Sequence, residues 1–279
     1  MSAQMDDTPP LRLLISDVDG TLVRNDKSLA DATVAAVSNA VAAGLPVTLI
    51  SARPPSGMYW IADRLGLAGP FGAFNGGVLF RRDRTVIARH CIDPQVCETV
   101  LALIREAGIT CWLFAGDQWL SSNDSDPHIP REVKSVNIQP IITDDFGDRL
   151  GRIDKIVGVS DDADLLIDLE ARAIAAVGGR ATIARSQPYY LDITAAVANK
   201  GDGVSFLANA FGVPLAQVAV IGDQANDLPM FARAGLSVAM GQATPEVQAR
   251  ATLTTVGNDE DGVAAAIAEI ILPRFTGRT

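Results

Sequence analysis

The sequence predicts an α/β fold built on a doubly wound parallel sheet, with an α+β domain inserted into it. Three observations support this prediction. Short apolar runs alternate with stretches of helical spacing in the first and last thirds of the chain, which is typical of βαβ units. Acidic motifs directly follow two of the apolar runs. The middle of the chain has a different order, with strands that follow one another as in hairpins.

The outer thirds of the chain predict the parallel sheet. In the first third we expect strand, helix, strand and helix in turn, over 11–16, 28–44, 45–50 and 54–66. In the last third we expect a helix, a strand, a short helix, a strand and a closing helix, over 203–211, 218–221, 228–234, 236–239 and 262–272.

The middle region predicts the inserted domain. Its expected elements are a helix, a hairpin, a strand, a helix and two further strands, over 94–107, 111–121, 153–159, 163–177, 181–184 and 190–194. We therefore expect a disordered lead-in over 1–10, a core domain over 11–82 plus 191–279, and an inserted α/β cap domain over 83–190.

Composition limits the possible partners. The chain has 279 residues, of which 48% are hydrophobic, and its formal net charge is −10. An acidic chain lacks the clustered Lys and Arg on which binding to nucleic acid or to an anionic membrane surface depends. No apolar run approaches the ~18–20 residues that span a bilayer. We therefore expect a globular protein that binds neither nucleic acid nor membrane, either a monomer or a weak homodimer.

The N-terminus and the cysteines suggest a compartment. The first ten residues contain two acids and two prolines and no apolar segment of the kind found in secretory signals. Cys91, Cys97 and Cys111 are odd in number and lack the spacing of metal ligands. We expect reduced structural thiols and a cytoplasmic location.

The sharpest motif is DVDGTL, which directly follows the first predicted strand. Asp17 and Asp19 are two carboxylates at the carboxyl end of a parallel strand, where open α/β sheets bind ligands. Gly20 allows a tight turn there. The alternative is an ordinary strand-ending turn, since Asp and Gly are common turn residues. The full motif behind an apolar strand favours a functional site.

The second motif is GDQAND, which follows the predicted strand over 218–221. Asp223 and Asp227 add two carboxylates and Asn226 an amide at another strand end. Converging strand ends would gather hard oxygen ligands, and like charges so close together call for a cation. We therefore expect Mg²⁺ as the cofactor. For Asn226 or Asp227 alone, helix N-capping is the alternative.

Two weaker signals complete the set. Ser51 offers a hydroxyl after the second predicted strand, with Arg53 nearby, although a serine before Pro54 could equally be a helix N-cap. Lys200 begins the helix that leads back into the core, although an isolated lysine is more often a solvated charge.

These motifs together resemble those of the haloacid dehalogenase superfamily phosphatases. DVDGTL, Ser51, Lys200 and GDQAND occur in the order of that superfamily's four motifs, with an insertion of the size found in its Cof-type branch. Asn75, in an Asn-Gly-Gly turn, resembles the turn that this branch has before its cap. Where the branch often has Thr-Gly-Arg, this chain has Ser51-Ala52-Arg53, which keeps the hydroxyl. The resemblance implies a Rossmann-like core with an inserted cap.

The resemblance also implies a role for each residue. Asp17 would be the nucleophile that forms an aspartyl-phosphate, and Asp19 the general acid and base. Mg²⁺ would be bound by Asp17, the backbone carbonyl of Asp19, and Asp223, while Asp227 would orient Lys200 or a metal-bound water. The residues expected to contact the phosphate are Gly20, Thr21, Ser51, Arg53, Asn75, Lys200 and Asn226.

The expected function is hydrolysis of small phosphate monoesters, such as sugar phosphates, by a Mg²⁺-dependent phosphatase. Two alternatives stay open: a sugar phosphomutase or phosphotransferase on the same fold, and a non-catalytic sensor of a phosphorylated metabolite. The cap would set substrate choice as a lid. Its aromatic residues could stack on a sugar, although packing against the cap sheet is their expected role; they are Trp112, Trp119, Tyr189 and Tyr190.

Overall fold

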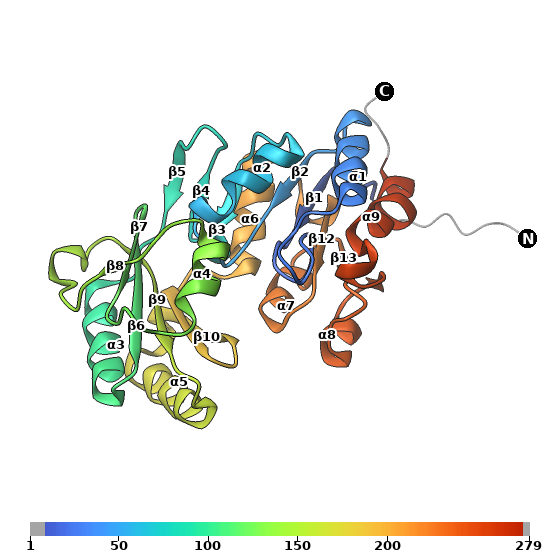
Figure 1. Cartoon of the computed structure of the whole chain (residues 1–279). Helices are drawn as coiled ribbons and strands as arrows, with labels where there is room; N and C mark the ends of the chain where they lie inside the picture. Colours follow the sequence, from blue (N-terminus) through green and yellow to red (C-terminus); the bar gives the residue numbers. More distant parts are fainter. Residues whose placement is uncertain (1–8, 276–279) are drawn as a thin grey trace, which may run out of the picture. The chain divides into compact units, whose positions relative to one another are not determined.

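The structure, a computed structural model, describes residues 9–275 and confirms the predicted α/β fold (Figure 1). These residues form two compact units, which are treated in turn below. The first unit runs up to Leu49, includes Leu65–Leu67 and resumes at Val204. The second unit consists of Ile50–Arg64 and Ala68–Gly203.

Two predictions about domain organisation are not settled by these units. Residues 1–8 of the expected disordered lead-in over 1–10 lie outside the described residues. The division into a core over 11–82 and 191–279 and a cap over 83–190 stays a prediction. The second unit contains the whole of 83–190 and also flanking segments on both sides.

The first unit contains a five-stranded sheet in which every strand pair is parallel. Its spatial order is β14 (Leu253–Thr254), β13 (Leu236–Ala239), β12 (Val218–Gly222), β1 (Leu13–Ser16) and β2 (Val47–Leu49). The sequence order therefore reverses between β1 and β12. Connections leave these two strands in opposite directions, which opens a crevice beyond their carboxyl ends where doubly wound sheets bind ligands.

The strands of this sheet are buried as the sequence predicted. Every residue of β1, β2, β12 and β13 is buried. Strands covered on both faces are expected to be continuous apolar runs rather than alternating ones, and this is why they could be located from the sequence.

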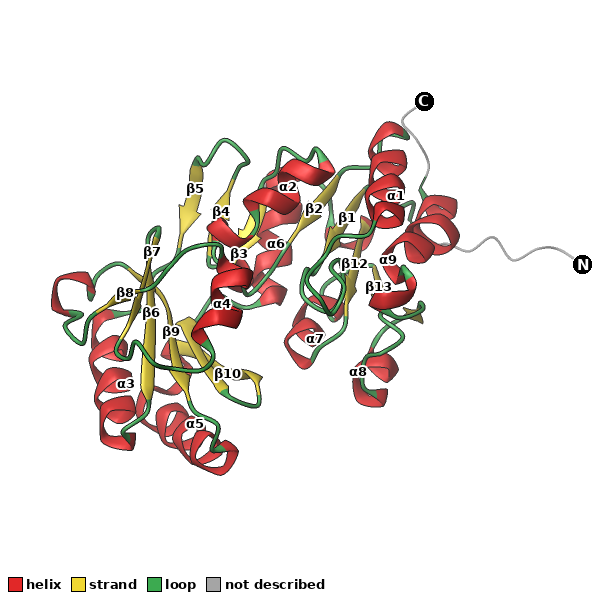
Figure 2. Cartoon of the chain, viewed as in Figure 1, coloured by secondary structure: helices red, strands yellow, loops and turns green. Residues whose placement is uncertain are grey.

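Helices accompany this sheet in the first unit (Figure 2). They are α1 (Asp31–Ala42), α7 (Leu228–Phe231), α8 (Pro245–Arg250) and α9 (Gly262–Ala265), and α9 continues as a π-helix over Ala266–Ile271. The chain enters the unit along α6 (Lys200–Phe211). The sequence analysis missed α8 and β14, which at six and two residues are too short to show a hydrophobic period.

The second unit contains a mixed six-stranded sheet. Its order is β10 (Ala181–Gln187), β11 (Tyr190–Ala195), β9 (Ile153–Val159), β6 (Thr110–Ala115), β7 (Gln118–Ser121) and β8 (Ile141–Ile142). All neighbours are antiparallel except β7 and β8. Residues of α3 (Pro94–Ala107) and α5 (Ala163–Val177) share one hydrophobic core with this sheet. The bounds of α3, α5 and β9 agree with the sequence prediction.

A second, three-stranded antiparallel sheet in this unit was not predicted. It consists of β3 (Phe71–Ala73), β4 (Val78–Phe80) and β5 (Val86–Arg89). Glycines interrupt the segment over 71–80 and charged residues precede β5, so no long apolar run marks these strands. The unit also contains the unpredicted α4 (Ile129–Val136), and α2 (Tyr59–Leu65) begins in it.

Aromatic packing in the six-stranded sheet follows the prediction. Trp112 and Trp119 are fully buried, with ring centroids 5.1 Å apart, and Tyr190 packs on Trp112 at 5.1 Å. Tyr189 is only half-buried and stacks on His128 at 4.3 Å. Packing therefore accounts for the first three rings.

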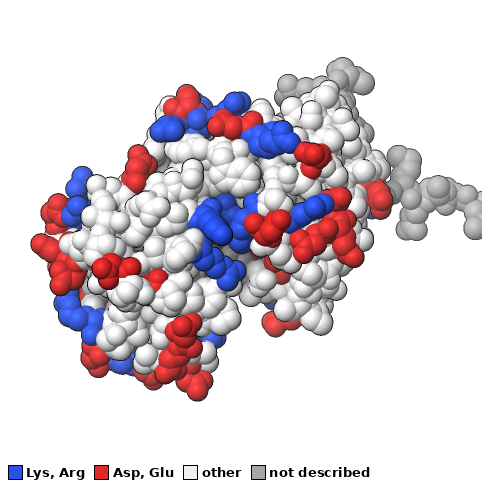
Figure 3. All heavy atoms as spheres, viewed as in Figure 1, with Lys and Arg blue, Asp and Glu red and all other residues white. Residues whose placement is uncertain are grey.

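The structure bears on three features of the composition: the cysteines, the charged side chains and the length of the apolar segments. Cys91, Cys97 and Cys111 form no disulfide in the structure, and the last two are buried. Figure 3 shows both acidic and basic side chains on this face, with a group of basic side chains near the middle of the view. Within 9–275, every helix is too short or too polar to cross a bilayer.

Asp154 is an acid buried in β9 of the six-stranded sheet. Its side chain is 1% exposed, and its Oδ2 accepts hydrogen bonds from Arg89 Nη1 at 2.6 Å and from the Gly116 N–H at 2.9 Å. Burial raises the pKa of Asp154 to about 6, although Arg89 acts in the opposite direction. The unfolded chain releases this proton near the ordinary value of 3.8. Between these pH values the folded protein binds more protons than the unfolded chain, so its stability falls as pH rises.

We therefore predict that Asp154→Asn changes the pH dependence of stability. Relative to the wild type, the variant should gain about 2 kcal/mol of unfolding free energy between about pH 4.5 and about pH 7.5, because it has no buried charge to form. Urea unfolding at several pH values measures this difference. Asp164→Asn, which removes an exposed acid from α5, is the control for the loss of one carboxylate. A constant difference between Asp154→Asn and wild type across this range would contradict the prediction.

Candidate functional site

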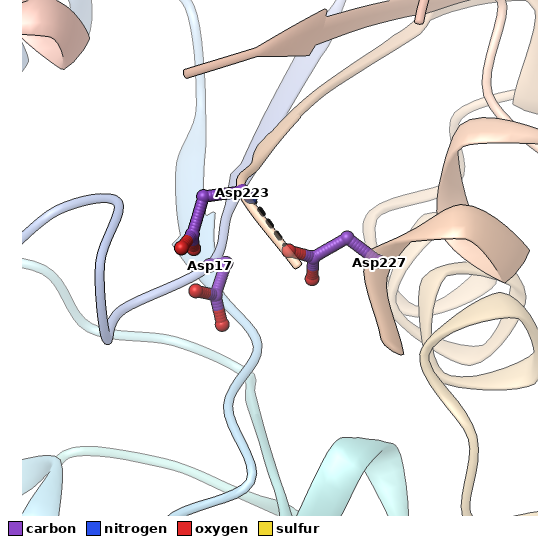
Figure 4. A group of neighbouring side chains, drawn as sticks. All are labelled: Asp17, Asp223 and Asp227. Carbon is purple, nitrogen blue, oxygen red and sulfur yellow. Dashed lines mark hydrogen bonds between the residues drawn. The ribbon is translucent and has the colours of Figure 1, made fainter. Parts of the chain in front are cut away.

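Three carboxylates from the two acidic motifs meet in the first unit. Asp17, Asp223 and Asp227 each offer an oxygen that lies within 4.8 Å of those of the other two (Figure 4). All three side chains are buried, with 4%, 3% and 0% exposure. The structure therefore brings together acids that are about 200 residues apart in the sequence, at the predicted end of the sheet.

Strand pairing explains this convergence. β1 and β12 are parallel, with Ser16 opposite Ile221, so both strands end at the same level. The Asp17 N–H extends the ladder by donating to the Ile221 carbonyl at 2.9 Å. Asp17 and Asp223 are the residues that directly follow β1 and β12, and their carboxylates consequently meet beyond the ends of these two strands.

Asp227 stabilises the backbone of the second motif by hydrogen bonds. Its Oδ2 accepts the N–H of Asp223 at 2.7 Å and the N–H of Gln224 at 2.9 Å. The helix-capping alternative is thus correct in part, because Asp227 satisfies backbone donors at the start of the short 3₁₀ helix Ala225–Asp227. Its expected role toward Lys200 or a metal-bound water stays a prediction.

Asp223 is positioned by two further side chains. Thr21 Oγ1 donates to its Oδ1 at 2.9 Å, and Gln224 Nε2 donates to its Oδ2 at 3.1 Å. Gly20 leaves the space that Asp223 occupies: its φ is +79°, and a Cβ built there would lie 2.4 Å from Asp223 Oδ2. The glycine in the DVDGTL motif is therefore required both for its left-handed backbone and for this close approach.

Asp19 lies apart from the buried cluster. Its side chain is 35% exposed, and Lys27 Nζ contacts its Oδ1 at 2.7 Å. Lys27 is a residue that the sequence analysis missed, because nothing in its spacing from the motif singles it out. Gln242 is another, since its Nε2 donates to the Gly20 carbonyl at 2.6 Å from the far end of the chain.

The residues present fit a divalent metal ion of the magnesium type. Three buried carboxylates supply hard oxygen donors, and their mutual repulsion favours a cation. Asn226 Oδ1 is also buried and accepts no hydrogen bond within residues 9–275, so it too is available to a ligand.

The remaining predicted residues belong to the second unit. Ser51 and Arg53 are buried, and Ser51 Oγ accepts the Arg53 N–H at 3.2 Å. The Ser51 carbonyl accepts the N–H of Asn75 at 2.7 Å, and Asn75 adopts a left-handed φ of +58°. The N-cap alternative for Ser51 is wrong, because the helical turn begins at Pro55 with Pro54 as its cap residue.

Lys200 is the first residue of α6 and is 2% exposed, so it is not the solvated charge of the alternative interpretation. The start of this helix packs against the Asn75 turn. A Cβ built on Gly76 would lie 2.4 Å from Gly203 Cα, which shows how closely the two backbones approach. Ser51, Asn75 and the Lys200 helix start are thus assembled within one unit. That they share a substrate with the acidic cluster stays a prediction.

Comparisons with known proteins agree with these observations. A family model described as haloacid dehalogenase-like hydrolase matches residues 14–267. The chain is 26% identical to 5-amino-6-(5-phospho-D-ribitylamino)uracil phosphatase from Bacillus subtilis, over 95% of this chain and 100% of that one. The crystal structure of a haloacid dehalogenase-like hydrolase from Bacteroides thetaiotaomicron has a TM-score of 0.84 and 28% identity, covering 93% of this chain and 99% of that one. A subclass IIB sugar phosphatase structure has a TM-score of 0.79 and 25% identity, covering 92% and 97%.

We predict that Gly20→Ala disturbs the acidic cluster. It should lower the free energy of unfolding by more than the strain of an alanine at positive φ accounts for. The control is Gly66→Ala, because Gly66 has a φ of +67° and no atom within 4 Å of a built Cβ. That control should lose about 1 kcal/mol of unfolding free energy. Gly20→Ala should lose more and should bind Mg²⁺ at least about tenfold more weakly, since Asp223 must move. Equal losses and equal Mg²⁺ affinities in the two variants, by urea unfolding and calorimetry, would count against this.

We also predict that Gly203→Ala is destabilising. Alanine in a helix is ordinarily about 1 kcal/mol better than glycine. Here a Cβ would lie 2.5 Å from Ile50 Cδ1 and 2.9 Å from the Asn75 carbonyl oxygen, so we expect a net loss of about 1–3 kcal/mol. Urea unfolding measures the sign directly, and a more stable variant would show that these segments do not pack as described.

Proposed function

The chain belongs to the haloacid dehalogenase-like hydrolases, and we propose that it is a Mg²⁺-dependent phosphatase that hydrolyses small phosphate monoesters. The observation that supports this most directly is the meeting of Asp17, Asp223 and Asp227 at the reversal point of the parallel sheet. The names of the phosphatase relatives above point to the same class of reaction.

Asp17 is proposed as the nucleophile. Its carboxylate would attack phosphorus in line with the leaving oxygen and form an aspartyl-phosphate, which water then hydrolyses. Its backbone is fixed by the hydrogen bond to the Ile221 carbonyl, so the attacking oxygen starts from a defined place beyond β1.

Asp19 is proposed as the acid that protonates the leaving alcohol and as the base that then takes a proton from water. It is more exposed than the buried acids, which suits a group that must reach the leaving oxygen and exchange protons with solvent. Lys27 Nζ lies 2.7 Å from its Oδ1 and would help to orient the carboxylate.

Mg²⁺ is proposed to be held by Asp17, Asp223 and the backbone carbonyl of Asp19. When bound, it would offset the charge of the carboxylates and of the transferring phosphoryl group. Asp223 is prepared for this by Thr21 and Gln224, which fix both of its oxygens.

Phosphate recognition is proposed for residues of both units. Ser51 and Asn226 would donate hydrogen bonds to phosphoryl oxygens, and Lys200 would provide the compensating positive charge. Supporting roles near the phosphate are proposed for Gly20, Thr21, Arg53 and Asn75. The substrates are small phosphorylated metabolites such as sugar phosphates, selected by a cap over 83–190. The cytoplasmic location and the monomer or weak homodimer remain predictions.

We predict that Asp17→Asn lowers the hydrolysis of para-nitrophenyl phosphate by at least about 10³-fold, because an amide cannot serve as the nucleophile. Release of para-nitrophenol measures the rate. Asp259→Asn, which changes an exposed acid bonded to Asn25, is the control and should keep wild-type activity. Substantial turnover by Asp17→Asn would rule out the nucleophile assignment.

Removal of metal and analysis of products test the rest of the proposal. Exhaustive chelation should abolish hydrolysis, and added Mg²⁺ should restore it.

Phosphate release from a panel of sugar phosphates distinguishes hydrolysis from phosphoryl transfer to a second sugar. Tight binding of these compounds with no turnover would instead favour the sensor alternative.

A further inference from the structure

A cavity in the second unit contains none of the residues assigned above to catalysis or phosphate binding. It has a volume of about 540 Å³, within the range of roughly 300–1,000 Å³ typical of small-molecule sites. Its walls come from the end of β5 and the residues after it, from the turn between β6 and β7, and from the segment before β9 (Figure 1).

The lining of this cavity is rich in arginine. Arg89, Arg149 and Arg152 face a single lining acid, Asp117. Arg149 is also paired with Asp148, but that carboxylate is 72% exposed, and such pairs contribute little. Arg149 Nε is buried and has no hydrogen-bond partner among residues 9–275. Arginines thus outnumber acids in the lining by three to one, although Asp154 and Asp148 pair with two of them.

One of the three arginines is fixed by the interior of the protein. Asp154, behind the wall, binds both Arg89 Nη1 and the Gly116 N–H through its Oδ2. Asp154 thus links β5 to the β6–β7 turn and positions the guanidinium group of Arg89. Arg149 and Arg152 have no buried acid as partner and could bind the oxyanion groups of a ligand. Asp117 can accept a hydrogen bond from a hydroxyl.

We propose that this cavity binds a small organic dianion that carries a hydroxyl group. The two arginines that have no buried acid as partner would recognise its oxyanion groups by forked hydrogen bonds. Asp117 would recognise its hydroxyl and would repel ligands with a further negative charge nearby. Binding would join β5 to the hairpin β6–β7 and to the start of β9, because all three contribute walls.

Cys91 provides a local measure of binding, since it lines the cavity and is partly exposed. The full chain is treated with iodoacetamide, and alkylation of the Cys91 peptide is followed by mass spectrometry. The probes are malate, a dicarboxylate, and glycerol 3-phosphate, both in the presence of a chelator that prevents hydrolysis of the phosphate ester. Glycerol and sodium chloride at matched ionic strength are the controls. At about ten times its dissociation constant, a bound dianion should slow alkylation about tenfold. The more protective probe identifies the preferred oxyanion.

Variants separate this cavity from other sites. Arg149→Gln and Arg152→Gln should each raise the probe concentration for half-protection about tenfold or more. Arg250→Gln, an exposed arginine of α8, should leave it unchanged. Cys97 and Cys111 are buried, so their slow alkylation confirms that each variant is folded. Lack of protection by both dianions would overturn the proposal, as would equal protection in wild type and both cavity variants.

Discussion

The crowding of three buried carboxylates is the constraint on which the first unit depends. Asp17, Asp223 and Asp227 repel one another within 4.8 Å, and burial deprives them of the water that would otherwise weaken this repulsion. The surrounding structure compensates with hydrogen bonds. Two backbone N–H groups bind Asp227, and Thr21 and Gln224 bind Asp223. A site built this way offers hard oxygen donors of the kind that bind a divalent cation.

Much of the fold could be predicted because its buried parallel strands are predominantly apolar, with turn residues and helical spacing between them. The same reasoning fails for β3, β4 and β5. Glycines interrupt the segment that contains β3 and β4, and β5 is exposed or half-buried, so no long apolar run marks these strands. It also fails for α4, in which the buried surface is small and Val136 is the one buried residue within the helix. Short elements of this kind are determined by their neighbours rather than by their own sequence.

The candidate site was predictable to the extent that its residues follow strands. Asp17 and Asp223 could be placed together because parallel strands end at one edge. Lys27 and Gln242 could not, since each contacts its motif through a loop whose path depends on tertiary structure. The arginine-lined cavity was likewise invisible. Its walls come from three separate segments of the chain, and a net charge of −10 hides any local excess of positive charge.

The position of β1 has a consequence for how the protein is made. β1 lies between β2, which is synthesised shortly after it, and β12, whose pairing residues emerge from the ribosome about 200 residues later. At about 5–20 residues per second, roughly 10–40 seconds pass before that second edge can be filled. During this interval a largely apolar strand lacks one of its two partner strands. The nascent chain is therefore open to aggregation and to chaperone binding until the last third has been translated.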